Sequence, residues 1–233
     1  MMFRTLFSSS VRRIVTIATI VTAACFASTP AHAWVYSTSA QWGSWSGGGF
    51  TVYNDIWSGE GNQTLNVNSG SSWQVVSSNM NGGGVKAYGN SSYILGKNSL
   101  TGYAGAYFDG NCTASAYDMS FDIWSNGSVD EIMLWMQWGG AVGPIGSEVA
   151  SNVNVGGWTW NIYRGNTGHN VVSLLNTSKP SSGDVDIMSI FQYLNSKGWL
   201  SSASIYQVQF GFEITTTSGT DTSNCYGYSH WQG

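Results

Sequence analysis

The sequence predicts an all-β fold, a sandwich or barrel of short strands, with a single amphipathic helix late in the chain. From Trp34 to about Gly183, short runs rich in Val, Ile, Thr, Tyr, Phe and Trp alternate with clusters of Gly, Asn and Ser. This alternation is typical of strands joined by polar turns, and many short strands indicate a sandwich or a barrel. One later segment instead has apolar residues at three- and four-residue spacing, which predicts a helix.

The predicted strands follow one another without a repeat or an interdomain linker. In chain order they include FTVYNDIW, SWQVVS, YAGAYF, SAYDMSFDIW, WTWNIYRG and IYQVQFGFEIT. A further run, VDEIMLWMQW at residues 129–138, has two acids before an apolar stretch. About 200 residues of this kind suit one domain with a sizeable core, which we expect over residues 34–233.

The helix is predicted within SGDVDIMSIFQYLNSKGW, residues 182–199. Its apolar stripe consists of Ile187, Ile190, Phe191 and Leu194. Asp184 and Asp186 precede this stripe and Lys197 follows it, which places acids and a base at the ends that the helix dipole favours. We expect the stripe to pack on the outer face of a sheet.

Residues 1–33 have the pattern of a secretory signal peptide. Arg4, Arg12 and Arg13 supply positive charge, an apolar core follows, and AHA ending at Ala33 has the small residues of a cleavage site. The sequence therefore predicts a secreted protein that is cleaved near Ala33. A retained membrane anchor is disfavoured because the apolar stretch is short for a membrane span.

The charge balance argues against nucleic acid as a partner. The chain has a net charge of −4, and residues 1–33 hold three of its eight basic residues and none of its twelve acids. The remaining basic residues are scattered singly, so no stripe could follow a phosphate backbone. A neutral ligand fits better, and we expect a monomer.

No cofactor or metal is expected from the motifs. The chain has no GxxxxGK loop for phosphate and no cluster with metal-ligand spacing. TSGTDTSNC, residues 217–225, could bind a cation, but such segments are more often polar turns.

The cysteines form an even pair once the signal peptide is removed. Cys25 leaves with it, while Cys112 and Cys225 remain in a protein bound for an oxidising compartment. We predict a disulfide between Cys112 and Cys225. The alternative is a pair of buried free thiols.

Side-chain alternation sorts the acids of three strands onto one face. In EIMLWMQW, an apolar row forms the predicted core face: Ile132, Leu134, Met136 and Trp138. Glu131 therefore points away from the core. The same rule turns Glu213 in QFGFE and Asp122 in SFDIW away from apolar rows. Three strands thus offer Asp122, Glu131 and Glu213 to a non-core face.

Paired carboxylates are the catalytic groups that remain after other chemistries are excluded. After processing only His169 and His230 remain, both in loop-like contexts, so Ser/His or Cys/His catalysis is not expected. Two carboxyls beside a neutral polymer, one protonated and one ionised, are the machinery of glycoside hydrolysis. The other acids considered are expected to be ordinary turn or surface residues: Asp118, Asp130, Glu60 and Glu148.

The tryptophans also favour a sugar ligand. The chain has twelve, and Trp42, Trp45 and Trp57 lie in Gly- and Ser-rich surroundings. Indole faces stack on the apolar faces of pyranose rings, while polar side chains satisfy the hydroxyls. The alternative is that these side chains fill a sandwich core.

The motifs resemble glycoside hydrolase family 12, secreted β-1,4-endoglucanases and xyloglucanases. DEIMLW resembles the strand of the family's nucleophile, QFGFE that of its acid/base, and FDIW carries an Asp like the one beside the nucleophile. NDIW lies where the family has a sugar-binding motif with two Asn, and GPIGS resembles the loop that crosses the cleft. The resemblance runs from about Trp42 to Glu213.

This resemblance implies a jelly-roll sandwich of two curved antiparallel sheets with a cleft on the concave face. It also implies hydrolysis with retention, in which Glu131 is the nucleophile, Glu213 the general acid/base and Asp122 a hydrogen-bonded neighbour of Glu131. The implied substrate-binding residues are Trp42, Asn54, Trp57, Met133, Trp135, Pro144 and Gln209.

The function predicted is therefore a secreted, endo-acting enzyme that cleaves internal β-1,4-glucosidic bonds. Its substrate could be cellulose, mixed-linkage β-glucan or xyloglucan, and the sequence leaves this open. Asp55 replaces the second Asn of the family motif, and ITTT follows Glu213, so subsite contacts differ. One alternative is a xyloglucan-specific endoglucanase, and another is a carbohydrate-binding sandwich without catalysis, which would gain little from desolvating two acids.

Overall fold

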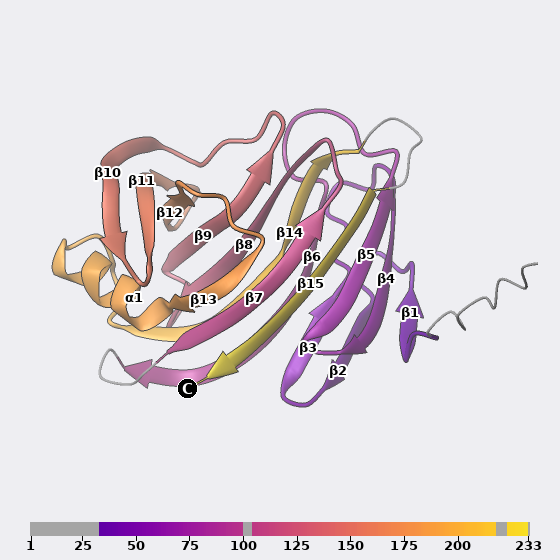
Figure 1. Cartoon of the computed structure of the whole chain (residues 1–233), viewed down its shortest axis with the longest axis horizontal. Helices are drawn as coiled ribbons and strands as arrows, with labels where there is room; N and C mark the ends of the chain where they lie inside the picture. Colours follow the sequence, from indigo (N-terminus) through magenta and orange to yellow (C-terminus); the bar gives the residue numbers. More distant parts are fainter. Residues whose placement is uncertain (1–32, 100–103, 218–222, 233) are drawn as a thin grey trace, which may run out of the picture. The chain divides into compact units, whose positions relative to one another are not determined.

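The computed structural model describes residues 33–99, 104–217 and 223–232 (Figure 1). Residues 1–32 of the predicted signal peptide, which include Cys25, lie outside these residues. Most of the segment 217–225, expected to be a polar turn, also lies outside them. From Trp34 onward the described residues form one compact unit of two sheets and a helix. None of their helices is long and apolar enough to cross a membrane.

The smaller sheet has six strands among the described residues. Its spatial order is β1 (Tyr36–Thr38), β4 (Asn62–Ser69), β5 (Ser72–Ser78), β15 (Ser223–Gln232), β7 (Gly105–Cys112) and β13 (Ser182–Asp186). All of its strand pairs are antiparallel.

The larger sheet has nine strands among the described residues. Its spatial order is β10 (Ser147–Val155), β11 (Trp158–Asn166), β12 (Asn170–Asn176), β9 (Asp130–Gly139), β8 (Ala116–Ser125), β14 (Ser204–Thr216), β6 (Ala87–Ser99), β3 (Phe50–Tyr53) and β2 (Ser44–Gly47). The pairs are antiparallel except that β12 runs parallel to β9. The three strands predicted to carry acids, β9, β8 and β14, are direct neighbours.

The two sheets lie face to face and enclose one core. In Figure 1, β7, β15 and β5 cross in front of the central strands of the larger sheet. Aromatic rings meet between them: the ring centroids of Phe108 and Phe121 are 6.0 Å apart and those of Phe121 and Phe210 are 5.0 Å apart. Each such side chain stabilises the fold by about 1.5–3 kcal/mol through burial. The all-β sandwich prediction is confirmed.

The helix α1 (Ile187–Ser196) is shorter than the predicted segment. The residues before it form β13, and Asp186 caps the helix by accepting a hydrogen bond from the Ser189 backbone N–H at 2.9 Å. The predicted apolar stripe, Ile187, Ile190, Phe191 and Leu194, is buried with the main core. The helix therefore packs on the core side of the larger sheet, beside β7 and β10, and the position expected for it on the outer face of a sheet is wrong.

Core-face alternation holds along β9 until a bulge interrupts it. Ile132, Leu134 and Met136 are buried in the main core. The register with β8 then skips Met136, because Trp135 pairs with Ser120 and Gln137 with Met119. This bulge turns Trp138 to the other face, where it packs near Trp135, so the core position predicted for Trp138 is wrong.

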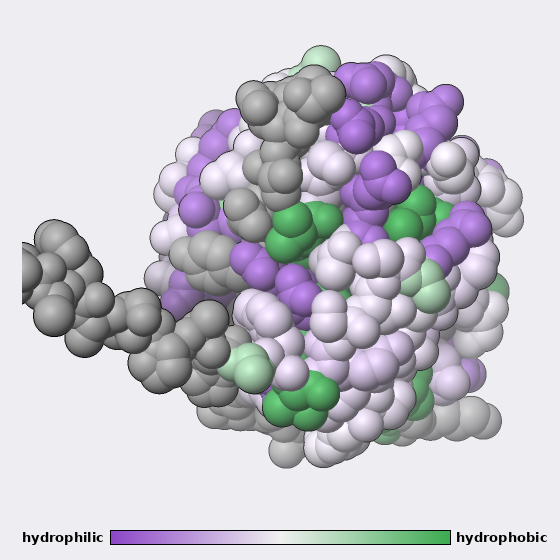
Figure 2. Space-filling model, turned by 90° about the vertical axis from the view of Figure 1, so that its right-hand side faces the viewer, coloured by the Kyte–Doolittle hydropathy of each residue, from purple (hydrophilic) through white to green (hydrophobic). Residues whose placement is uncertain are grey.

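The surface at the β1 end of the sandwich is mostly polar. Figure 2 shows that side with its apolar residues in small, separate patches among pale and purple ones. Scattered apolar residues of this kind are ordinary for a protein surface.

Candidate active site

A cavity of about 490 Å³ lies over the face of the larger sheet that points away from the core. Three adjacent strands supply carboxyl groups to its lining, namely Glu131 from β9, Asp118 from β8 and Glu213 from β14. Asp122, four residues after Asp118 on β8, is only 6% exposed and pairs in register with Met133 and Gln209. The face predicted for the three acids therefore carries four.

Glu131 is held by a histidine from a turn. His169 Nε2 lies 2.6 Å from Glu131 Oε2, and their side chains are 27% and 15% exposed. The His169 ring also contacts the Trp124 ring, with centroids 5.1 Å apart. Glu131 thus lies at the cavity surface with one oxygen already engaged by a nitrogen.

Asp122 is close enough to influence Glu131 but does not have a hydrogen bond to it among the described contacts. Its Oδ2 accepts a hydrogen bond from Trp124 Nε1 at 3.0 Å, and its buried Oδ1 has no partner. Burial raises the pKa of Asp122 well above its ordinary value, and the negative charges of Glu131 and Glu213 raise it further. The hydrogen bond predicted between Asp122 and Glu131 is replaced by the one to Trp124.

Glu213 is paired with another acid. Asp118 lies directly opposite it in the β8–β14 register, and their side chains are hydrogen-bonded. Burial, the charge of Asp118, this hydrogen bond and the charge of Glu131 all raise the pKa of Glu213 well above its ordinary value. Because one carboxyl must donate in such a contact, the pair shares a proton.

Asp118 was expected to be an ordinary turn acid, and that prediction is wrong. The residue is 1% exposed, and Ser120 Oγ donates a hydrogen bond to its Oδ1 at 2.8 Å. Burial raises its pKa to about 7, against the lowering effect of the hydrogen bonds from Ser120 and Glu213. Side-chain alternation along β8 puts Asp118 on the same face as Asp122, but its burial in the assembled sheet has no signal in the sequence.

Asp130 is buried as well, but for a structural reason. Its carboxylate accepts hydrogen bonds from Asn170 Nδ2 at 2.8 Å and from the backbone N–H groups of Ser201 and Ser202 at 2.8 and 2.9 Å. It points away from the cavity and joins β9 to β12 and to the segment after α1. The prediction of a simple turn acid is therefore wrong for Asp130 too.

The walls of the cavity include residues that alternation placed beside Glu131. Met133 and Trp135 line it and are 5% and 3% exposed. They pack with Leu175 in a cluster separate from the main core. The buried Trp135 Nε1 has no hydrogen-bond partner among the described residues.

The GPIGS loop borders the same cavity. Ala141, Val142, Gly143 and Ile145 line it, next to the half-buried Pro144. Gly146 has φ of +89°, and a Cβ there would lie 1.8 Å from the Arg164 carbonyl oxygen. Only glycine therefore lets this loop run so close to β11.

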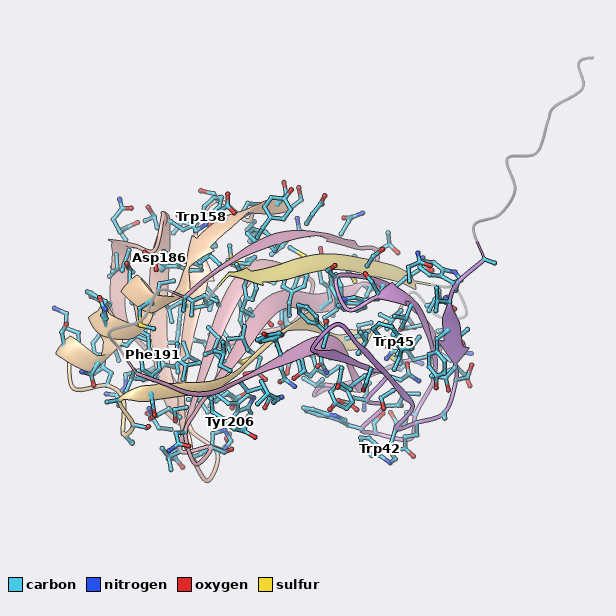
Figure 3. The ribbon with its side chains drawn as sticks, turned by 90° about the horizontal axis from the view of Figure 1, so that it is seen from below. Trp42, Trp45, Trp158, Asp186, Phe191 and Tyr206 are labelled. Carbon is cyan, nitrogen blue, oxygen red and sulfur yellow. The ribbon has the colours of Figure 1, made fainter. Side chains whose placement is uncertain are left out.

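The aromatic candidates divide between the surface and the core. Trp57 lines the cavity, is 51% exposed, and meets Tyr88 edge to face with centroids 6.1 Å apart. Trp42 is 62% exposed, and Figure 3 shows it at the same side of the molecule as Tyr206 and opposite to Trp158. Trp45 instead packs against the main core.

Asn54 does not face the cavity, contrary to the expectation that it binds sugar. It is 0% exposed, and its side-chain amide donates to the carbonyl oxygens of Ala40 at 2.9 Å and Gln63 at 3.3 Å. It continues the buried row of Val52 and Ile56. The residue that turns toward the other face is its neighbour Asp55.

Gln209 belongs to a polar chain beside the site. It donates to Asn90 Oδ1 at 3.3 Å, and Asn90 Nδ2 lies 3.3 Å from Asp55 Oδ2. Burial raises the pKa of Asp55, while the hydrogen bond from Asn90 lowers it. This chain connects the NDIW segment to β14, and the predicted contact of Gln209 with substrate stays a prediction.

Away from the cavity, Cys112 is disulfide-bonded. In the register of β7 and β15 its Cα partner is Cys225. Among the described residues, no group of three or more His, Cys, Asp or Glu side chains is arranged to hold a metal ion.

Comparisons with known proteins agree with this geometry. The model of glycosyl hydrolase family 12 matches residues 35–231. Xyloglucan-specific endo-β-1,4-glucanase A of Emericella nidulans is 30% identical over 213 residues, which cover 81% of this chain and 89% of that enzyme. A probable enzyme of the same name from Aspergillus terreus is 32% identical and matches 81% of this chain and 85% of its own length.

Solved structures give the same family and fold. The xyloglucanase domain of NopAA, a type three effector from Sinorhizobium fredii, was solved in complex with cellobiose and has a TM-score of 0.79 at 36% identity, covering 85% of this chain and 98% of that domain. Endoglucanase 3 of Trichoderma harzianum, from family GH12, has a TM-score of 0.75 at 27% identity, covering 84% and 96%. The predicted jelly-roll class is thereby confirmed.

Proposed function

Since this chain belongs to glycosyl hydrolase family 12 and is an endo-acting β-1,4-glucanase, we propose that it works with retention through Glu131 and Glu213. The observation that carries this assignment is the unequal environment of the two carboxyls in one cavity. Glu131 contacts an imidazole nitrogen, whereas the pKa of Glu213 is raised well above its ordinary value by burial and by Asp118. Two carboxyl groups in such different environments can act one as the acid and the other as the nucleophile.

In the first step Glu213 donates its proton to the glycosidic oxygen as Glu131 attacks the anomeric carbon. The bond from that carbon to the leaving sugar breaks, and a glycosyl-enzyme ester forms on Glu131. In the second step the Glu213 carboxylate takes a proton from water, whose oxygen attacks the anomeric carbon and releases Glu131. A retaining enzyme needs the two carboxyls about 5–5.5 Å apart for this sequence.

Asp118 has the role of holding the Glu213 proton. Its carboxylate accepts the hydrogen bond that the protonated Glu213 donates, and its negative charge opposes ionisation of Glu213. The Glu213 acid is thereby kept protonated until the glycosidic oxygen takes its proton. Burial and the charges of both catalytic glutamates raise the pKa of Asp122, which favours its neutral form beside them.

The sugar subsites are proposed along the remaining lining. Trp57 in the lining offers an exposed indole face for stacking on glucose units, and Trp42, exposed outside the lining, offers a second one. Met133 and Trp135 form part of the cavity wall. Xyloglucan is the preferred substrate that the relatives suggest, because E. nidulans and A. terreus relatives carry that specificity in their names. We assign the chain to the extracellular space as a monomer, cleaved near Ala33 and bridged between Cys112 and Cys225.

The function is tested by viscosity loss and reducing-sugar release on xyloglucan, barley β-glucan, carboxymethylcellulose and xylan. A fast fall in viscosity on xyloglucan, with slower action on the unbranched glucans, is expected. Equal rates on all β-1,4-glucans would reject the xyloglucan preference but leave the enzyme class intact.

The catalytic assignment has its own test in azide trapping with an aryl cellobioside. Glu131→Ala is expected to give the α-glycosyl azide, because azide replaces the nucleophile on its own face. Glu213→Ala is expected to give the β-glycosyl azide, because azide then attacks the glycosyl-enzyme. Inversion of these products would exchange the two roles, and absence of both would refute them.

A further inference from the structure

His169 contacts Glu131 but has no part in the two chemical steps of the proposed mechanism. Its Nε2 is 2.6 Å from Glu131 Oε2, a short distance for a nitrogen and an oxygen and typical of a hydrogen bond to a charged group. An ionised carboxylate can only accept, so the proton of this contact lies on Nε2. One oxygen of Glu131 is engaged, and Oε1 is the oxygen left for the anomeric carbon.

The His169 ring is fixed from two sides. The ring makes a tilted contact with Trp124, with an angle of 52° between the ring planes, and Trp124 is itself held by the hydrogen bond from its Nε1 to Asp122. The turn that carries His169 is closed by a hydrogen bond from the Gly168 backbone N–H to Asn166 Oδ1 at 2.9 Å. A donor held in this way can orient the carboxylate that it contacts.

The residue after His169 anchors the turn to the sheet. Asn170 donates to Asp130 Oδ1 and to the Trp199 carbonyl oxygen, each at 2.8 Å. Asn170 also pairs with Asp130 in the parallel register of β12 and β9. The turn is therefore tied to the residue that precedes Glu131, which fixes His169 relative to the carboxylate.

From this geometry we infer that His169 is a positioning residue that orients Glu131 and stabilises its negative charge through Nε2–H. This inference rests on the proposed function, because it concerns Glu131 as the nucleophile. Negative charge leaves Glu131 when the glycosyl-enzyme forms and returns when it breaks down. The hydrogen bond therefore assists the second step most, by making Glu131 a better leaving group.

The test uses 2,4-dinitrophenyl β-cellobioside, whose leaving group makes the second step limit kcat. His169→Leu keeps an apolar side chain of related size but has no donor, and we expect its kcat to fall by about 10- to 100-fold, as for loss of a hydrogen bond to a charged group. The value of kcat/KM reports the first step and should fall less, so KM should fall as well. His169→Gln keeps an N–H donor and should recover most of kcat.

His230→Leu is the matched control, because it makes the same substitution on β15 of the smaller sheet, whereas Glu131 lies on β9 of the larger sheet. It should leave the ratio of kcat to kcat/KM unchanged. Wild-type kcat in His169→Leu, or equal losses of kcat and kcat/KM, would overturn the inference. If His169→Leu does not fold, His169→Ala replaces it with the same criteria.

Failure of this inference can be separated from failure of the proposed function. If Glu131→Ala yields α-glycosyl azide while His169→Leu behaves as wild type, only the role of His169 is refuted. If Glu131→Ala yields no azide product and retains hydrolysis, the nucleophile assignment fails, and the inference fails with it.

Discussion

The surroundings of Glu131 and Glu213 differ in charge and in the direction of their hydrogen bonds. Glu131 on β9 lies beside an imidazole and an indole, and a nitrogen contacts one of its oxygens. Glu213 on β14 lies beside the buried Asp118 and shares a proton with it. One cavity thus holds a glutamate in contact with a nitrogen and a second glutamate whose pKa is raised, an inequality that suits a retaining mechanism.

Replacing either glutamate removes one of these two environments and has the largest expected effect. Glu131→Gln and Glu213→Gln should each lower glucan hydrolysis by about four orders of magnitude or more, since each removes one of the two chemical roles. The two should separate on 2,4-dinitrophenyl cellobioside, whose leaving group needs no acid. There Glu213→Gln should give a burst of dinitrophenol and Glu131→Gln none.

A melting temperature within a few degrees of wild type is the control for both variants. Near-wild-type activity in either would remove that residue from its role. A burst in Glu131→Gln would show that another group is the nucleophile.

Asp118→Asn replaces the acidic partner of Glu213 with a neutral side chain. The lost negative charge makes Glu213 easier to ionise, so the basic limb of the pH profile should move to lower pH. Activity at pH 7 should fall by about 10- to 100-fold as the acid form is depleted. A pH series of kcat/KM on a glucan measures this, and an unmoved basic limb would contradict the role of Asp118.

The same substitution should raise stability at pH 7, although it lowers activity there. The folded pKa of Asp118 is about 7, above the ordinary unfolded value near 3.9, so its contribution to stability is present below pH 4 and lost as pH rises to 7. Asparagine does not titrate, so this loss of stability is absent from Asp118→Asn. Between pH 4 and pH 7 the melting temperature of the variant should therefore rise relative to that of the wild type. Urea or thermal unfolding at the two pH values measures it, and an equal pH dependence in both proteins would contradict it.

Side-chain alternation in the sequence predicted the face of the three acids correctly. Prediction failed where a side chain's position depends on residues distant in the chain. Glu131, Glu213 and Asp122 face one side because each strand has an unbroken apolar row opposite them. His169 was missed because its turn reaches Glu131 through the parallel pairing of β12 with β9, which no local pattern specifies. Trp138 was misplaced because a bulge at Met136 has no sequence signal of its own.

Asn54 was misplaced for a different reason. The family motif was given more weight than the alternation of Val52, Asn54 and Ile56, which would have turned Asn54 inward. The alternation rule was also available for Asp118, but burial of a carboxyl beside a second carboxyl is a property of the assembled sheet. Local pattern therefore predicted the face of each side chain better than its environment.

Trp57→Ala tests the sugar-binding surface that both glutamates share. Trp57 lines the cavity beside Tyr88, and loss of its stacking should raise KM by up to about tenfold, since aromatic contacts contribute about 0.5–1.5 kcal/mol. The value of kcat should change little. Initial rates on soluble glucan measure this, with Trp158→Phe, on the opposite side in Figure 3, as the control. An equal KM in both variants would remove Trp57 from the subsites.

Asp130→Asn should have the smallest effect on chemistry, although it is the direct neighbour of Glu131 in the sequence. Its carboxylate accepts hydrogen bonds from Asn170, Ser201 and Ser202, and an amide would turn an N–H toward one of these donors. We expect a loss of about 1–3 kcal/mol in the free energy of unfolding, measured with urea, and kcat within about threefold of wild type. A larger fall in kcat without loss of stability would mean that Asp130 acts on Glu131 directly. Unchanged stability would mean that the turn carrying His169 is anchored by other contacts.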